Sequence, residues 1–257
     1  MGKYRFLKKN AVLAAALTFL CVAMVPLMTG SAMGQQPRRL LLSSLPEPPE
    51  ELKKLLAAGP VTFEVGPRQT TGDPRIIGET RYEISYRYKS QAQWRLLRDD
   101  LGARVLVIDA GFSRVQWKPR HVIWLRHQPA AEEFWSNSVL LHEFDHLRIS
   151  TDPHVARRFS ELLRQRRVIR YKLQPGEVPG RVLTDSLVER EARAVFDELT
   201  DLIAIRYREL DRETSHGREP LPSSSSLYEL LRPKAVSGNG DEDSGGPDSG
   251  IVPGRNN

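Results

Sequence analysis

Hydrophobic and polar positions change their spacing near Pro129, and this change divides the main part of the chain in two. Before it, from Val61 on, short runs rich in Val, Ile, Tyr and Trp alternate with polar residues, which predicts β-strands. These runs are VTFEV, RYEISYRYK, ARVLVID, SRVQWK and HVIWLR, and one helix near SQAQWRLLRDD is expected to interrupt them. After it, helical spacing predicts three helices, at about 131–150, 153–170 and 184–213. Strands followed by helices predict an α+β fold.

The first 34 residues have the organisation of an export signal. A basic segment, MGKYRFLKKN, precedes eighteen apolar residues, and the small residues Ala32 and Gly34 suit a cut before Gln35. The alternative is an uncleaved membrane anchor, because eighteen apolar residues nearly span a bilayer. Pro26 within the run favours cleavage. Both interpretations predict an exported protein that is periplasmic, on the cell surface or secreted, with membrane contact only if this segment stays uncleaved.

Composition divides the rest of the chain into three parts. Residues 35–60 are expected to be a linker that contains a short helix, PEELKKLLAAG, with Pro at its start and Gly at its end. Residues 61–217 form the predicted domain. Residues 218–257 include SSSS and SGNGDEDSGGPDSG, and so polar a segment is expected to be a flexible low-complexity tail.

Charge and cysteine content exclude several classes of function. The formal net charge is +6, but the first ten residues carry four basic side chains and no acid. Without them the balance is nearly even, and no basic patch alternates with aromatic residues, so a nucleic-acid partner is not expected. The single cysteine, Cys21, lies in the apolar run. The rest of the chain therefore has neither a disulfide nor a thiolate metal site.

The segment LLHEFDHLRIS contains His142, Glu143 and His146 in the order H-E-x-x-H. Two histidines four residues apart lie on one face of a helix and can bind one zinc ion. The glutamate between them can take a proton from zinc-bound water and pass it to the leaving amine. This spacing predicts a Zn²⁺-dependent hydrolase of peptide bonds, with Glu143 as general base and then general acid.

The residues around this motif favour the helix that it requires. The segment AAEEFWSNSVLLHEFDHLR contains neither Gly nor Pro. Leu140, Phe144 and Leu147 have the spacing i, i+4, i+7, which predicts a stripe that faces the core.

The third zinc ligand has several candidates. Asp152 lies six residues after the second histidine, but it precedes a proline and has the features of a helix N-cap. Glu189 and Glu191 lie on a helix that is acidic throughout, so a solvated face also explains them. His216 follows the last predicted helix, where it can also act as a cap. The spacing alone leaves these alternatives open.

From about Arg81 to Gly217, the chain resembles a bacterial family of predicted secreted zinc-dependent proteases, a domain of unknown function. The resemblance rests on the strand YEISYRYK with ARVLVIDAGFSRVQW after it, on the helix that leads from Trp135 into LLHEFDHLRI, and on LDRETSHG at residues 210–217. The last segment is similar to a Y-D-x-x-T-x-H-G pattern, with Leu210 in place of the Tyr and without the Gln-Gly that often follows.

The resemblance implies a zincin-like fold, a small N-terminal mixed or antiparallel sheet followed by helices. It also implies that His142 and His146 bind zinc, and it makes His216 the first choice for the third ligand. In zincins an edge strand beside the active helix pairs with extended substrate, which suggests residues 121–126, although an ordinary sheet strand is the alternative. His121 and His127 are expected at the surface.

The function predicted from these observations is that of an exported zinc metallopeptidase acting on peptide or protein substrates. The alternative is a non-catalytic envelope binding or scaffold protein with a structural or vestigial zinc site. A catalytic site keeps an open coordination position, whereas four protein ligands close a structural one. Tyr207 is one candidate for stabilising the oxyanion.

Overall fold

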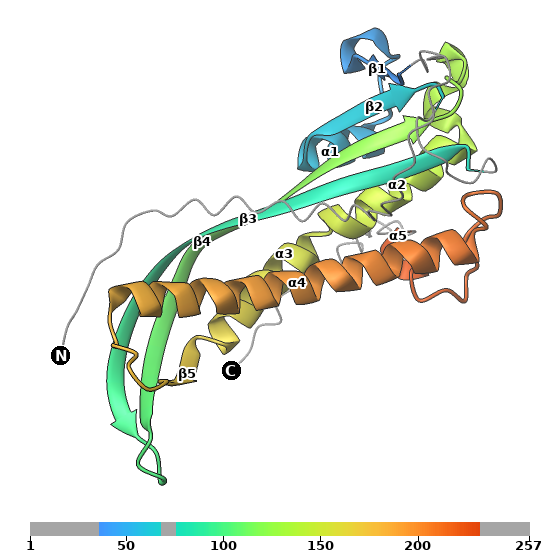
Figure 1. Cartoon of the computed structure of the whole chain (residues 1–257). Helices are drawn as coiled ribbons and strands as arrows, with labels where there is room; N and C mark the ends of the chain where they lie inside the picture. The colour runs from blue at the N-terminus through green and yellow to red at the C-terminus, as the bar shows by residue number, and fades with distance from the viewer. Residues whose placement is uncertain (1–35, 68–75, 232–257) are drawn as a thin grey trace, which may run out of the picture.

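The computed structural model describes residues 36–67 and 76–231 (Figure 1). The predicted signal peptide, residues 1–34, and the part of the predicted tail beyond residue 231 lie outside the described residues. The elements in chain order are β1 (Arg38–Leu40), η1 (Leu42–Ser44), α1 (Glu50–Ala58), β2 (Val61–Val65), β3 (Gly78–Arg98), β4 (Arg104–Leu125), η2 (Ala131–Ser136), α2 (Ser138–Thr151), α3 (Pro153–Gln165), β5 (Val168–Lys172), α4 (Arg181–Glu213) and α5 (Tyr228–Leu231).

The five strands form one mixed sheet, in the order β1-β2-β4-β3, with β5 paired to the first part of β4. Strands β2 and β4 run parallel, and the other pairs are antiparallel. The predicted α+β class with a mixed sheet ahead of the main helices is therefore confirmed. Within the described residues, no helix is both long enough and apolar enough to span a bilayer.

Strands β3 and β4 form a long hairpin whose pairs run from Gly78↔Leu125 to Arg98↔Arg104. The register shifts between Arg87 and Lys89, and a bulge of this kind bends a strand. Figure 1 shows that the hairpin curves along its length and that its closed end extends beyond the helices. Three of the predicted short runs, ARVLVID, SRVQWK and HVIWLR, are thus parts of one strand.

The helix predicted near residues 90–100 is wrong, because this segment lies in β3 and pairs with β4. Its Gln, Leu and Arg residues favour a helix locally, but alternate residues of this segment face a hydrophobic cluster, as in a strand. Ala92 is buried and Trp94 is partly buried, and both pack in a cluster with Leu106 and Ile108 of β4. Sheet pairing and packing outweigh the local preference.

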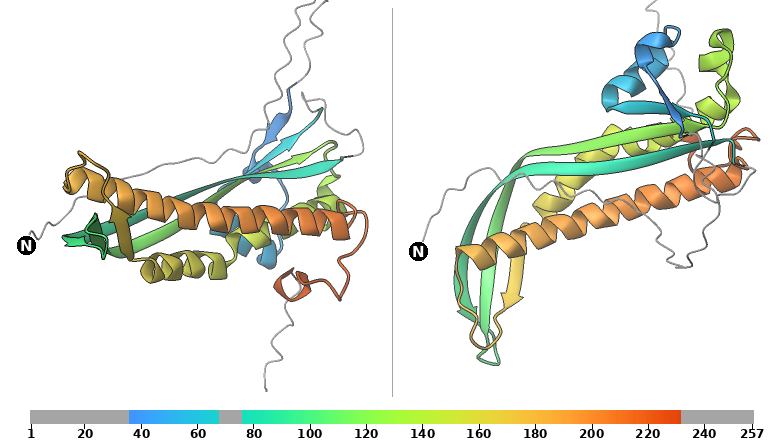
Figure 2. Two further views of the ribbon diagram at one scale, coloured as in Figure 1. Left: turned by 60° about the horizontal axis from the view of Figure 1, so that its bottom comes forward. Right: turned by 45° about the horizontal axis from the view of Figure 1, so that its top comes forward.

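Helices α2, α3 and α4 pack against the hairpin, as Figure 2 shows. The first predicted helix starts with the 3-10 turn η2, and α2 proper begins at Ser138. The second predicted helix ends too late, because residues 168–172 form β5 on the sheet instead of continuing α3. The third, α4, has 33 residues and is therefore about 50 Å long. This length carries the chain from the closed end of the hairpin back to α2.

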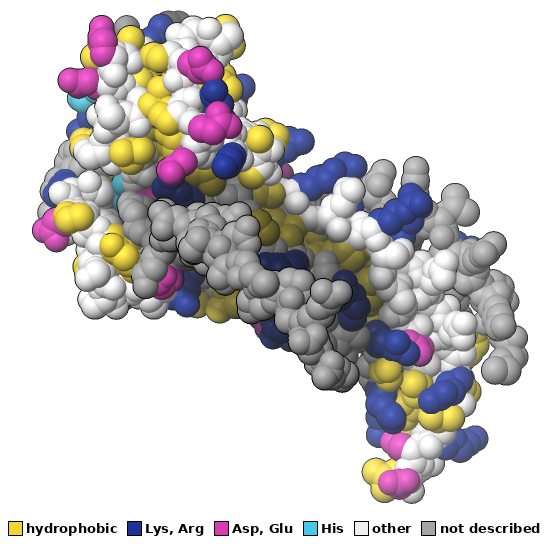
Figure 3. Space-filling view, turned by 180° about the vertical axis from the view of Figure 1, so that it is seen from behind, with side chains coloured by type: hydrophobic (Ala, Val, Ile, Leu, Met, Phe, Trp, Pro, Cys, Tyr) yellow, Lys and Arg dark blue, Asp and Glu magenta, His cyan; other side chains and the backbone are white. Residues whose placement is uncertain are grey.

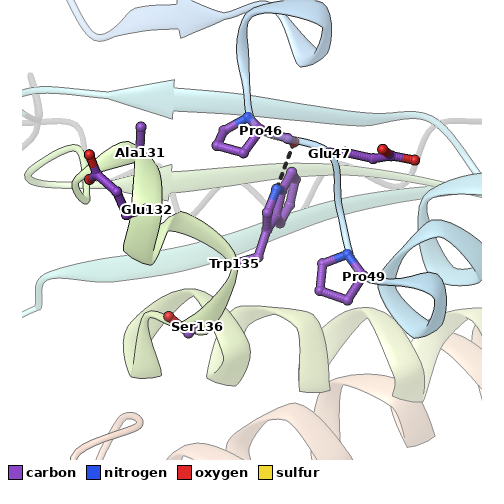
Figure 4. Close-up of a pocket in the computed structure, with 7 residues that line it drawn as sticks. All are labelled: Pro46, Glu47, Pro49, Ala131, Glu132, Trp135 and Ser136. Carbon is purple, nitrogen blue, oxygen red and sulfur yellow. Dashed lines mark hydrogen bonds between the residues drawn. The ribbon is translucent and has the colours of Figure 1, made fainter.

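Residues 36–60 contribute β1 and α1 to the same folded unit. Leu40 and Leu52 are buried in one cluster with Phe63 of β2 and Phe144 of α2. Trp135 donates a hydrogen bond from Nε1 to the carbonyl oxygen of Pro46, at 2.7 Å, beside a hollow lined by proline and glutamate side chains (Figure 4). Near the end of the described residues, Leu221, Leu227 and Leu231 are buried in one cluster with residues of α3 and α4, and α5 contacts α2.

The segment HVIWLR is not a sheet edge. Residues 121–125 pair with β2 on one side and with β3 on the other, so they lie in the interior of the sheet. The prediction of residues 121–126 as the substrate-binding edge is therefore wrong. Among the described residues, β3 pairs only with β4, which leaves its second edge without a strand partner.

Candidate metal centre

Helix α2 places its two histidines on one buried face. Asn137 caps the helix, since its side chain accepts a hydrogen bond from the backbone N–H of Leu140. Leu140, Phe144 and Leu147 are completely buried against the sheet, as their spacing predicts. This packing fixes the rotation of the helix, so that His142 and His146 point away from the sheet core.

Asp211, in the last turn of α4, meets both histidines. Its Oδ1 atom lies 3.1 Å from Nε2 of His142 and 3.1 Å from Nε2 of His146. The potential ligand atoms of these three residues all lie within 4.8 Å of one another, a set that can hold a metal ion. Ligands about 2.0 Å from a shared tetrahedral metal ion are about 3.3 Å apart, and the two separations that involve Asp211 are close to this value.

Charge favours the ionised form of Asp211. Burial raises the pKa of this carboxyl, but hydrogen bonds from His142 and His146 outweigh burial and hold the pKa well below its usual range. An ionised carboxylate and two imidazoles together make a donor set that matches the preference of zinc for nitrogen and oxygen ligands.

The turn after α4 presses closely against His142. Ser215, His216 and Gly217 all have positive φ angles, of 50°, 57° and 78°. A Cβ atom at position 217 would lie only 2.7 Å from Cβ and Cγ of His142, so only glycine fits there. The His-Gly pair in LDRETSHG therefore marks a left-handed turn beside the metal centre.

Thr214 sets the tautomer of His142. Its hydroxyl donates to the carbonyl oxygen of Leu210, at 2.7 Å, and lies 3.3 Å from Nδ1 of His142. Because the hydroxyl hydrogen is already used, Nδ1–H of His142 is the donor in the second contact. Nε2 is then the nitrogen directed at Asp211, and a metal ion that replaces the hydrogen between Nε2 and this carboxylate would bind there.

Glu143 lies buried beside the two histidines. Burial raises the pKa of its carboxyl, while the neighbouring imidazoles of His146 and His142 oppose this effect. Its Oε2 atom is buried and has no hydrogen-bond partner among the described residues. A Cβ atom at position 78 would lie 2.7 Å from Oε1 of Glu143, so Gly78 of β3 leaves room for the carboxylate. An oxygen without a protein partner can accept a hydrogen bond from water or from a ligand.

A buried polar network lies behind His146. Tyr207 donates its hydroxyl to Oγ of Ser150, at 3.0 Å, and Nε2 of His121 lies 2.6 Å from the same oxygen. The rings of Tyr207 and His146 have centroids 4.4 Å apart. The prediction that His121 is at the surface is wrong, since it is 2% exposed, whereas His127 is exposed as expected. The Tyr207 hydroxyl, a candidate for oxyanion stabilisation, is engaged with Ser150.

A cleft of about 440 Å³ opens beside His142. Its walls come from the start of α2, from the segment before β3 and from the turn after α4. The lining residues are Ile77, Ser138, Val139, Leu141, His142, Asp145, His216, Gly217, Arg218, Glu219, Pro220 and Leu221. Solvent and a ligand of a few residues can thus reach the side of the metal centre.

The other ligand candidates lie in different surroundings. Asp152 is the N-cap of α3, as its sequence context predicts. Glu189 accepts a hydrogen bond from Tyr88, at 2.6 Å, and Glu191 lies 3.8 Å from Arg166. His216 lies at the rim of the centre, with a side chain that is 60% exposed and Nδ1 at 3.5 Å from Oδ1 of Asp211. Its role as third ligand stays a prediction.

Asp211 and Thr214 are the residues of this centre that the spacing of the histidines does not reveal. Both lie in LDRETSHG, so the pattern that selected His216 also contained the acid five residues earlier. That acid lies in the last turn of α4, where its side chain can reach the histidines of α2.

The donor set formed by His142, His146 and Asp211 fits a bound metal ion. Comparisons of the chain with protein-family models, with curated proteins and with solved structures found no match.

Proposed function

We propose that the protein is a zinc-dependent metallopeptidase of the H-E-x-x-H type with a zincin-like fold. One observation carries the proposal: Nε2 of His142 and Nε2 of His146 both lie 3.1 Å from one oxygen of Asp211, next to the buried carboxyl of Glu143. Three groups form this set within the described residues, which leaves a fourth coordination position for water or substrate. A three-ligand centre beside a cleft favours catalysis over a closed structural site.

In this proposal each residue of the centre has a defined task. A zinc ion held by His142, His146 and Asp211 would polarise the substrate carbonyl and lower the pKa of water at the open position. Glu143 takes a proton from the attacking water, for which burial and the resulting raised pKa suit it. The same carboxyl then passes the proton to the leaving amine. Thr214 keeps His142 in its metal-binding tautomer through the 3.3 Å contact to Nδ1.

The substrate is proposed to be a peptide in extended form, bound along the free edge of β3. Gly78 begins this strand directly beside Glu143, and the hydroxyl of Thr80 donates to the carbonyl oxygen of Glu143, at 3.2 Å. An extended segment can add to such an edge through main-chain hydrogen bonds. We further propose that the protein is exported, with residues 1–34 as the signal.

The metal content of the purified full-length chain tests the centre. Elemental mass spectrometry is expected to find about one zinc per chain, because the described residues contain one set of three clustered ligands. Asp211→Ala is expected to lose the zinc, and His216→Ala is expected to retain it. If His216→Ala loses zinc while Asp211→Ala keeps it, His216 is the third ligand. Absence of zinc after reconstitution overturns the proposal.

Cleavage of unfolded protein substrates tests the chemistry. Glu143→Gln keeps the shape of the side chain, so it is expected to retain zinc and to abolish turnover. Glu132→Gln is the matched control, because Glu132 is an exposed acid beside the hollow near Trp135. Turnover that survives Glu143→Gln rules out the assigned role. A wild-type chain that binds zinc but cleaves nothing favours the binding-protein alternative.

A further inference from the structure

The closed end of the β3–β4 hairpin, together with β5 and the start of α4, exposes an unusual amount of apolar surface. We call this region, residues 94–109 and 167–182, the distal end. Eleven large hydrophobic side chains are exposed within the described residues, and six of them lie here: Leu96, Leu97, Leu101, Val168, Val178 and Val182. Leu101 is 89% exposed and Val182 is 84% exposed. Such a concentration marks a site of interaction.

The same region is basic. It contains seven Arg and Lys residues against four Asp and Glu residues, while the whole chain has 38 against 32. Its acids also have local partners: Asp99 accepts hydrogen bonds from two backbone N–H groups of the turn, and Glu177 accepts one from Tyr171. Figure 3 shows basic and hydrophobic side chains side by side at this end. The partner is therefore expected to be both negatively charged and apolar.

The placement of the apolar residues distinguishes a bilayer from a protein partner. Leu96 pairs with Leu106 and Leu97 pairs with Val105, so the two leucines point to opposite faces of the hairpin. Leu101 lies in the turn between the strands. A protein partner buries one face, whereas a lipid surface surrounds a protruding tip on every side. Figure 1 shows that this tip extends beyond α4.

We propose that the distal end inserts its hairpin tip into the surface of an anionic membrane. Leu96, Leu97 and Leu101 enter the boundary between headgroups and acyl chains, while the surrounding basic side chains contact lipid phosphates. This contact is independent of the N-terminal apolar segment and of any activity at the metal centre. It holds the metal centre away from the lipid, at the opposite end of α4.

A fluorophore at the tip tests the proposal in the full-length chain. Cys21→Ser removes the sole cysteine, and Leu101→Cys then allows an environment-sensitive dye to be attached at a fully exposed position. With vesicles of phosphatidylglycerol and phosphatidylcholine, the emission is expected to shift to the blue and to rise about threefold, as for a group that leaves water. Vesicles of phosphatidylcholine alone are expected to give little change.

The control places the same dye at Leu41→Cys, which is 71% exposed near β1, away from the distal end. The dye at position 41 is expected to show no change. This control distinguishes insertion of the distal end from attachment through the N-terminal segment alone. Arg95→Glu together with Arg98→Glu is expected to abolish the response at position 101, and high salt is expected to weaken it. An unchanged signal at position 101, or equal signals at 101 and 41, overturns the proposal. A response without vesicles that grows with protein concentration also overturns it, because it indicates contact with a second copy.

Discussion

Gly217 lies so close to His142 that the backbone of Gly217 determines where the imidazole of His142 can lie. A Cβ atom at residue 217 would approach Cβ and Cγ of His142 to 2.7 Å, and Gly217 has a φ of 78°. Gly217→Ala is therefore expected to displace the imidazole and to lower zinc affinity by about tenfold or more, as for other changes that misorient a ligand. Competition with a chromophoric chelator measures this affinity.

Gly102→Ala is the matched control for this change. Gly102 has nearly the same φ, 77°, but no atom lies within 4 Å of a Cβ placed there. Both variants bear a backbone cost of about 1–2 kcal/mol, and only the variant at 217 is expected to lose zinc. Equal zinc affinity in the two variants contradicts the proposed contact.

Thr214→Val is expected to weaken zinc binding without removing a ligand. The change keeps the side-chain shape but removes the oxygen that lies 3.3 Å from Nδ1 of His142. Loss of such a partner typically costs 10–100-fold in metal affinity. Thr214→Ser restores the hydroxyl and is expected to recover most of the affinity. Thr200→Val serves as control, because its hydroxyl bonds only to backbone oxygens of α4. If the valine and serine variants bind zinc alike, Thr214 does not orient His142.

Gly78→Ala is expected to separate turnover from metal binding. The added Cβ would lie 2.5 Å from Cγ1 of Val139 and 2.7 Å from Oε1 of Glu143, so the carboxylate has to move. Zinc content is expected to stay near one per chain while turnover falls by about a hundredfold or more, the scale of a general-base effect. Gly111→Ala, on the partner strand, makes only ordinary contact at 3.7 Å and is expected to retain activity. Full turnover in Gly78→Ala argues against Glu143 as the base.

His121 is expected to make the fold less stable in acid. Burial, and to a smaller extent the neighbouring His146, lowers the pKa of His121 to about 4. Between pH 6.5 and 4 the unfolded chain binds a proton that the folded chain does not, so stability falls as the pH falls through this window. The loss is about 3 kcal/mol when complete, from 1.36 kcal/mol for each unit of difference.

Denaturant unfolding of zinc-free protein at several pH values measures this dependence. His121→Asn is expected to have a smaller change in unfolding free energy between pH 6.5 and 4 than the wild type, whatever its absolute stability. His127→Asn removes an exposed histidine and is expected to leave the change as it is in the wild type. Parallel curves for wild type and His121→Asn contradict the assignment.

Features that depend on neighbours within a few residues could be predicted from the sequence. The helix that carries His142 and His146, its buried stripe and the N-cap at Asp152 all follow from spacings of two to seven residues. Such spacings determine which side chains share a face of a helix, whatever the rest of the chain does. The α+β class of the fold followed in the same way, because runs with alternating hydrophobic and polar residues precede segments with helical spacing.

Only the tertiary structure decided which distant residues complete the site. Asp211 is 65 residues from His146, and the length of α4 brings the two together. Pairing across the hairpin turned residues 90–98 into a strand despite their helical preference, and it placed residues 121–125 inside the sheet with β3 at the edge. Hydrogen bonds between strands and packing between helices join segments far apart in the chain, and the local pattern contains no information about which segments meet.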